Sequence, residues 1–152
     1  MNSESNFIPV ESLDTEKSYQ HLVSFNFEGK EQAVSFIETT QVTDGVDCDV
    51  YSFAEDESKD LGIIKIGPGK KTPLQRVLQG EKTIEGYVSG KGKLTITRAD
   101  GKQENFMADG SSLNATVNIG ELMQWEADPN SDLVAFEICY PPYEDGRFEN
   151  II

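Results

Sequence analysis

The sequence is poor in the side chains from which metal sites and nucleophilic catalytic sites are usually built. Its 152 residues include one histidine, His21, and two cysteines, Cys48 and Cys139. One histidine cannot supply a histidine-rich metal site, and a Ser–His or Cys–His nucleophile has only His21 to draw on. The cysteines are far apart and have no CxxC neighbour, so we expect two free, buried thiols rather than a zinc pair or a disulfide.

Basic residues and long apolar runs are also scarce. The chain has 13 Lys and Arg against 27 Asp and Glu, a net charge of -14 at pH 7. Nucleic acids and anionic membranes need a basic face, so neither is expected as a partner. No run approaches the roughly 18 apolar residues of a membrane helix. The opening MNSESNFIPVES lacks the basic and apolar regions of a signal peptide, so we expect a cytoplasmic protein. The acidity serves solubility, or it steers a cationic ligand or partner.

The length of the chain suits one domain. Residues 1–18 are polar and acidic apart from a short apolar patch, and we expect an irregular N-terminal arm. Residues 19–152 show no linker and no internal repeat, and we expect them to form a single domain.

Short alternating segments dominate that domain, and no segment keeps a helical period over three turns. Tyr19–Phe27 alternates so that His21, Val23 and Phe25 share one face, which makes His21 a structural histidine rather than a base. Residues 54–60 are predicted to be an acidic loop, and the tail 143–152 is expected to pack across the outside. Strands separated by Gly, Asp and Pro turns predict an all-β sandwich or barrel. The further predicted strands are 33–42, 50–53, 61–66, 94–98, 103–107, 115–119, 122–127 and 133–140.

The stretch Gly67–Leu94 carries the most specific pattern: GPGKKTPLQRVLQGEKTIEGYVSGKGKL. A Gly/Pro lead-in precedes the strand-like Leu74–Val77, and GYVSGKGKL follows with a tight Gly-Lys-Gly turn. This stretch resembles the first motif of the small single-domain cupins, and the FEICYPP segment, residues 136–142, resembles their closing strand. The resemblance covers roughly residues 60–142. It implies a cupin-type double-stranded β-helix, a jelly-roll barrel, preceded by the irregular arm.

The resemblance also implies where a cupin carries its metal ligands, and those positions hold other chemistry. Valine cannot bind a metal, neutral glutamine and threonine are weak ligands, and a thioether prefers copper(I). We therefore expect no bound metal and no cofactor, which removes the dioxygenase, oxalate-degrading and metal-isomerase activities of the family. The positions are Gln75 and Val77 for the paired histidines, Thr83 or Glu81 for the glutamate, and Met123 for the second-motif histidine.

Alternation along these strands predicts what faces the interior of such a barrel. Arg76 points outward, to the surface or a dimer interface, while its neighbours in the strand point inward. The expected ligand pocket consists of Gln75, Val77, Thr83, Met123, Trp125 and Cys139. The candidate catalytic groups are Glu85, Glu137 and Tyr87. Two buried carboxyl groups without a metal can move protons, because burial and a like-charged neighbour raise the pKa of one of them.

Three hypotheses for function remain open. The first is a metal-independent barrel that binds a small organic ligand, a sugar or a cyclic metabolite. The second is a metal-independent isomerase, epimerase or cyclase that uses the candidate catalytic groups for proton transfer. The third is a dimeric structural or interaction module whose barrel is filled by its own side chains. The expected partners are a small molecule and a second copy of the chain in a homodimer.

Overall fold

A computed structural model describes residues 21–78, 80–110, 113–142 and 148–151. The predicted arm, residues 1–18, lies outside the described residues. The described chain is built from strands, and it contains no helix long and apolar enough to cross a membrane. The strands are β1 (Ser24–Phe27), β2 (Lys30–Thr43), β3 (Val46–Phe53), β4 (Asp56–Ile66), β5 (Leu74–Val77), β6 (Lys82–Gly90), β7 (Gly92–Thr97), β8 (Gln103–Ala108), β9 (Asn114–Asn118), β10 (Leu122–Ala127), β11 (Leu133–Tyr140) and β12 (Phe148–Ile151).

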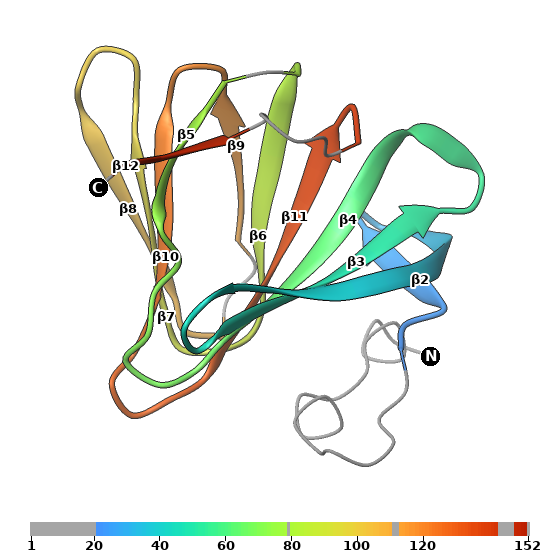
Figure 1. The fold of residues 1–152 in the computed structure, drawn as a ribbon, viewed down its shortest axis with the longest axis horizontal. Coiled ribbons are helices and arrows are strands. Elements are labelled where there is room, and N and C mark those ends of the chain that lie inside the picture. The colour runs from blue at the N-terminus through green and yellow to red at the C-terminus, as the bar shows by residue number, and fades with distance from the viewer. Residues whose placement is uncertain (1–20, 79, 111–112, 143–147, 152) are drawn as a thin grey trace.

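The strands form two antiparallel sheets that face each other as the walls of a barrel (Figure 1). The 7-stranded sheet has the order β1-β2-β3-β4-β11-β6-β9, and the 5-stranded sheet has the order β12-β5-β10-β7-β8. From β4 to β11 the chain crosses between the two sheets at every step except the β7–β8 hairpin, in the manner of a double Greek key, which is a jelly roll. The predicted all-β barrel is confirmed.

The main hydrophobic core lies between the two sheets. Ile64, Ile66 and Leu133 enter it from the larger sheet, and Leu94 and Trp125 from the smaller one. These are the alternating inward positions of their strands, so the period of two places the apolar side chains together. Trp125 is 2% exposed, which makes it one of the largest fully enclosed side chains of the barrel.

A second core covers the opposite face of the larger sheet. Phe25 and Phe27 of β1 contact Phe136 of β11 edge to face, with ring centroids 5.1 and 5.9 Å apart. Leu61 and Ile63 of β4 belong to the same cluster. The strands β1 to β3 therefore protect an outer face that the barrel alone would leave open to solvent.

The first predicted strand is shorter than its sequence pattern indicates. Tyr19 and Gln20 lie outside the described residues, and β1 begins only at Ser24. Val23, predicted to share the apolar face, is 79% exposed. Leu22 is buried instead, and its backbone N–H donates to the Tyr51 hydroxyl at 3.2 Å. The chain turns before β1, so a shared face for His21, Val23 and Phe25 is wrong.

Two other predicted segments differ from the structure. Residues 54–60 are not a loop: only Ala54 and Glu55 turn, and Asp56 begins β4. The acidic side chains of β4 can reach solvent while its backbone pairs with β3. The run of acidic residues therefore does not indicate a loop here. In the tail, residues 143–147 lie outside the described residues, and β12 pairs with β5 instead of crossing the outside. This pairing satisfies the open edge of β5.

The Gly90-Lys91-Gly92 turn between β6 and β7 needs both of its glycines. Gly90 has a φ of +88°, which other residues rarely adopt. A Cβ atom on Gly90 would collide with the backbone carbonyl of Asp132, and one on Gly92 with that of Glu126. The turn therefore packs tightly against the strands that carry Trp125 and Glu137.

Candidate functional site

A cavity of about 820 Å³ lies inside the barrel, between the two sheets. Side chains from β2, β3, β4, β5, β6, β10, β11 and β12 line it. Its rim includes exposed residues of β2, among them Ile37 and Val42, which are 56% and 38% exposed. The enclosed part contains Glu85, Trp125 and Met123, each buried. The barrel is therefore not filled by its own side chains.

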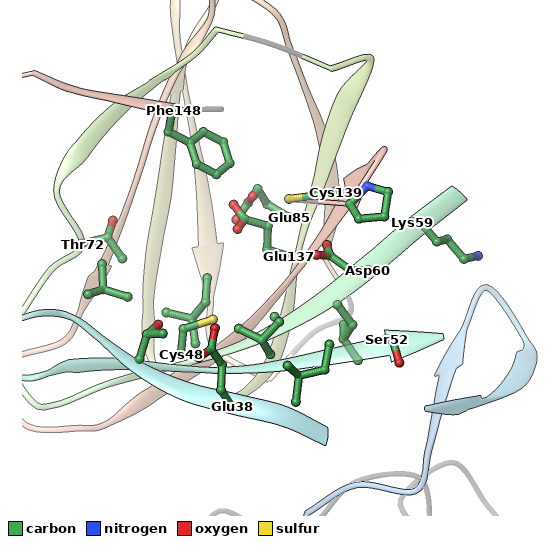
Figure 2. Close-up of a pocket in the computed structure, with 18 of the residues that line it drawn as sticks. Glu38, Cys48, Ser52, Lys59, Asp60, Thr72, Glu85, Glu137, Cys139 and Phe148 are labelled. Carbon is green, nitrogen blue, oxygen red and sulfur yellow. The ribbon is translucent and has the colours of Figure 1, made fainter. Parts of the chain in front are cut away.

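Glu85 and Glu137 form a carboxyl pair inside this cavity. They are directly opposite each other on the adjacent strands β6 and β11. Residues in such positions have Cβ atoms about 4.5–5.5 Å apart and project from the same face of the sheet. Figure 2 shows both carboxyl groups pointing into the same space. Glu85 is 0% exposed, so this part of the pair is shielded from water.

Trp125 holds Glu85 from the opposite sheet. Its indole N–H donates to Glu85 Oε1 at 2.7 Å. Trp125 is itself anchored by Thr72, because its backbone N–H donates to Thr72 Oγ1 at 3.0 Å and its carbonyl accepts from Thr72 N at 2.9 Å. The orientation of Glu85 is thus fixed by three elements: β6, β10 and the segment before β5.

The surroundings of Glu85 favour its protonated form. Burial, first, and then the negative charge and hydrogen bonding of Glu137 raise the pKa of Glu85 well above its ordinary value. Hydrogen bonds from Trp125 and Thr83 act in the opposite direction and are smaller. The carboxyl pair therefore holds a proton at a pH at which an exposed glutamate has lost it, and the pair titrates as a unit.

A thiol borders the same site. Cys48 of β3 lines the cavity and is half-buried. Burial, followed by the negative charges of Glu137, Asp49 and Asp60, raises the pKa of the Cys48 thiol far above its ordinary value. Cys48 is therefore a neutral thiol, and it is not an activated nucleophile.

The structure brings most of the predicted pocket residues to the cavity. Gln75, Met123, Trp125 and Cys139 line it together with the carboxyl pair. Gln75 is opposite Met123 on the paired strands β5 and β10, so the two side chains lie on the same wall.

Three predicted residues are placed elsewhere. Val77 and Thr83 are buried at 0% exposure but do not line the cavity. Tyr87 is half-buried, and its hydroxyl donates to the Gly90 carbonyl at 2.8 Å. Its hydroxyl is thus tied to the β6–β7 turn instead of the carboxyl pair.

Other residues that line the cavity were not predicted from the sequence, among them Cys48, Asp60 and Phe148 (Figure 2). Alternation through Val46 and Cys48 could have placed the thiol inward, because Val46 is 0% exposed on the same face. Asp60 was assigned to a loop. Phe148 reaches the site only through the pairing of β12 with β5, for which the sequence carries no local signal.

The side chains at the family's metal-ligand positions do not form a metal site. Gln75 Nε2 donates to Asn150 Oδ1 at 3.1 Å, and Val77 packs in the core between the sheets. Met123 offers only a thioether. No group of three or more His, Cys, Asp or Glu among the described residues is arranged to hold a metal ion. The donor set therefore does not fit the divalent-ion chemistry that the resemblance implies.

No protein-family model matches the chain, and no curated protein matches it. Solved structures resemble it at low sequence identity. Oxalate decarboxylase from Bacillus subtilis matches with a TM-score of 0.61 and 17% identity over 74% of this chain and 29% of the decarboxylase. A cupin-2 domain from Rhodospirillum rubrum matches with a TM-score of 0.57 and 14% identity over 84% of this chain and 79% of its own.

The capsular polysaccharide assembling protein CapF from Staphylococcus aureus also matches, with a TM-score of 0.57 and 12% identity. That match covers 78% of this chain and 34% of CapF. The chain thus spans only a minor part of the decarboxylase and of CapF. At these identities the likeness shows the fold alone, and it confirms the cupin fold indicated by Gly67–Leu94.

Proposed function

We propose that this cupin-fold chain binds a small organic ligand inside its barrel without a metal ion. The observation that carries the proposal is the cavity of about 820 Å³ that contains the carboxyl pair and Trp125. Small-molecule sites are concave spaces of roughly 300–1,000 Å³ with apolar walls and a few oriented polar groups. A barrel filled by its own side chains, the third hypothesis, has no such space.

The walls suit a ring-shaped body with polar substituents, such as a sugar or a cyclic metabolite. Trp125, Phe148 and Met123 offer apolar and aromatic surface. Glu85, Glu137 and Gln75 offer hydrogen-bonding groups on the facing walls. Because Trp125 fixes Glu85, the polar groups are oriented before a ligand arrives, and this lowers the entropic cost of binding.

The test is to find a ligand that depends on the cavity. The protein is purified without added metal, incubated with a small-molecule extract, washed and denatured, and the released compounds are identified by mass spectrometry. Cys48→Phe places a bulky ring in the cavity, and Ser35→Phe places the same ring on the exposed surface of β2. The ligand should be released by the wild type and by Ser35→Phe, and not by Cys48→Phe. Equal recovery from both variants would refute the proposal, provided that circular dichroism shows each to be folded.

The geometry of the carboxyl pair also favours the second hypothesis, proton transfer in an isomerase, epimerase or cyclase. In that case Glu137 as a carboxylate takes a proton from substrate carbon, and protonated Glu85 returns one at another atom. The raised pKa of Glu85 fits the role of acid. Tyr87 takes no part in this version, because its hydroxyl is bound to Gly90.

Glu137→Gln separates the two functions. For a proton-transfer enzyme it should abolish turnover of the released ligand and leave its affinity within a few-fold of the wild type. For a binding protein no isomerised product forms in the wild type either. Exchange of substrate hydrogen for deuterium from solvent, followed by nuclear magnetic resonance, detects the proton transfer directly.

A further inference from the structure

The charges around the cavity are strongly one-sided. Lys59 is the one basic side chain among its lining residues. The acidic lining residues are Glu38, Asp56, Glu57, Asp60, Glu85 and Glu137. A concave site lined by charges of one sign concentrates its field inside and raises the local concentration of ligands of the opposite sign. An anionic ligand would be repelled from it.

Lys59 does not neutralise the deep part of this site. Its ammonium lies 3.6 Å from Asp56 Oδ2 and over the Phe53 ring, 4.7 Å from the ring centroid. Figure 2 shows its side chain directed away from Glu85 and Glu137. Among the lining residues that the structure describes, the one cation is therefore directed away from the carboxyl pair.

One carboxyl oxygen of the buried Glu85 is available to a ligand. Glu85 Oε1 accepts the hydrogen bond of Trp125, but Oε2 receives none of normal geometry from any described residue, although Thr83 and Glu137 are adjacent. Glu85 is 0% exposed and lines the cavity. Once the proton of the pair has left, Oε2 is a buried acceptor without a donor, which is costly, so a ligand that brings a donor to Oε2 gains from satisfying it.

The apolar walls lie beside these acceptors. Trp125, Met123 and Phe148 line the same cavity as Glu85. Aromatic faces attract cations through their quadrupole as well as burying apolar surface. A ligand with an ammonium group next to a ring or a short hydrocarbon body would satisfy the carboxyl pair and cover these walls together.

From this arrangement we propose that the ligand is an organic amine, bound as its cation, with the ammonium donating to the Glu85 and Glu137 carboxyl groups and the apolar body against Trp125 and Phe148. The proposal rests on the proposed function, since it names the ligand class of the same cavity. It also gives the net charge of -14 a role in steering the cation to the barrel.

Proton release follows from this binding mode. The carboxyl pair holds a proton in the empty protein, and an ammonium group is best bound by two carboxylates, so the cation displaces the proton. Alkylamines stay charged below about pH 9, so the pH dependence between pH 6 and pH 8 belongs to the protein. The observed affinity for an amine should rise with pH, by up to about tenfold per pH unit if one proton leaves per ligand bound. The other ionisable groups that line the cavity are Glu38 on β2, Cys48 on β3, Asp56, Glu57, Lys59 and Asp60 on β4, and Cys139 on β11.

Three probes of similar shape test the charge preference: phenethylamine as the cation, phenethyl alcohol as the neutral analogue and hydrocinnamate as the anion. Binding is followed by calorimetry and by the fluorescence of Trp125, the single tryptophan of the chain. Phenethylamine should bind at least tenfold tighter than phenethyl alcohol, and hydrocinnamate should bind more weakly than either. Calorimetry in buffers of different ionisation enthalpy should detect proton release with the amine alone.

Glu85→Gln and Glu137→Gln should each reduce the preference for the amine over the alcohol by at least tenfold. Glu81→Gln removes the same charge from an exposed position outside the cavity, and the preference should stay within twofold of the wild type. Equal affinities for amine and alcohol, or tightest binding of hydrocinnamate, would overturn the amine assignment and leave ligand binding by the barrel standing. Binding of none of the three probes also counts against the assignment, and the recovery experiment with Cys48→Phe then decides the proposed function by itself.

Discussion

The indole N–H of Trp125 donates to Glu85 Oε1 across the barrel, 2.7 Å away, and joins the two sheets through their buried interior. Both side chains are almost fully enclosed, at 2% and 0% exposure. A hydrogen bond between buried groups has no water to replace it when one partner is removed. The bond therefore both stabilises the barrel and sets the position of the cavity's deepest acid.

Loss of this bond should be measurable as a coupling energy. Trp125→Phe keeps an aromatic ring but leaves Glu85 Oε1 without its donor, and it should lower the free energy of unfolding by about 1–3 kcal/mol. In a Glu85→Leu background, Trp125→Phe should cost roughly 1 kcal/mol less, because the variant has no Glu85 oxygen that could be left without a donor. Urea unfolding of the two single variants and the double variant gives both values. Additive effects would show that the bond contributes no net stability.

Glu85 should make the stability of the protein depend on pH. Its pKa is raised on folding by burial and by Glu137, so the native state binds more protons than the unfolded state above the ordinary glutamic acid value. Stability then falls with rising pH by up to about 1.4 kcal/mol per unit until the folded pKa is passed. Glu85→Gln should be more stable than the wild type at about pH 8, with a difference that shrinks toward about pH 5. Glu57→Gln, exposed at the rim, should show no such trend in thermal unfolding scans.

The Cys48 thiol should react slowly in the folded protein. Burial and neighbouring carboxylates raise its pKa, so little thiolate, the reactive form, exists near neutral pH. In a Cys139→Ala background, alkylation of Cys48 by iodoacetamide at about pH 8 should be at least tenfold slower in buffer than in concentrated urea. Mass spectrometry of quenched samples gives both rates. Equal rates would mean that Cys48 is neither shielded nor surrounded by negative charge.

The β6–β7 turn offers a test of packing against backbone conformation. Gly90 and Gly101 have similar positive φ values, +88° and +89°, but only at Gly90 would a Cβ atom meet other atoms. Gly101→Ala should therefore cost about 1–2 kcal/mol, the conformational penalty alone. Gly90→Ala should cost about 1–3 kcal/mol more, because Asp132 must move. Chemical denaturation of the two variants measures these changes in the free energy of unfolding. Equal losses of stability would contradict the close packing of Gly90 against Asp132.

Metal content tests the donor set directly. The protein purified without added metal should contain far less than one iron, manganese or zinc ion per chain by elemental mass spectrometry. Treatment with a strong chelator should leave ligand recovery and thermal stability unchanged. Near-stoichiometric metal that the chelator removes with loss of stability would contradict the assignment based on Gln75, Val77 and Met123.

Local patterns were sufficient to predict much of the fold. The strands at residues 122–127 and 133–140 were predicted with the bounds that the structure gives to β10 and β11. Their alternation also placed Trp125 and Glu137 on inward faces. In β11 the opposite face is packed as well, against the second core. The Gly-Lys-Gly turn was predicted from its two glycines, and the structure shows that a Cβ atom at either position would collide with backbone atoms.

Features that depend on contacts between distant segments could not be predicted from the sequence. Phe148 enters the site because β12 completes the edge of β5, and hydrogen bonds between backbones carry no sequence signature. Asp60 was missed because a run of acidic residues was read as a loop, while in β4 the backbone pairs and the charges reach solvent or the rim. Val23 is exposed because the chain turns where the Leu22 N–H donates to the Tyr51 hydroxyl. Tyr51 is 29 residues away from Leu22, so the local sequence does not show this contact.

The position of β11 has a consequence for how the chain reaches this structure. In the larger sheet β11 lies between β4 and β6, although both precede it by many residues. During synthesis, the edges of β4 and β6 that will pair with β11 stay unpaired until residues 133–140 have been made and can insert between them. Such non-local pairing is slow to form. Because β11 also carries Glu137, the carboxyl pair forms in the same late step that closes the sheet. A chain stalled before this step exposes unpaired strand edges and lacks the carboxyl pair.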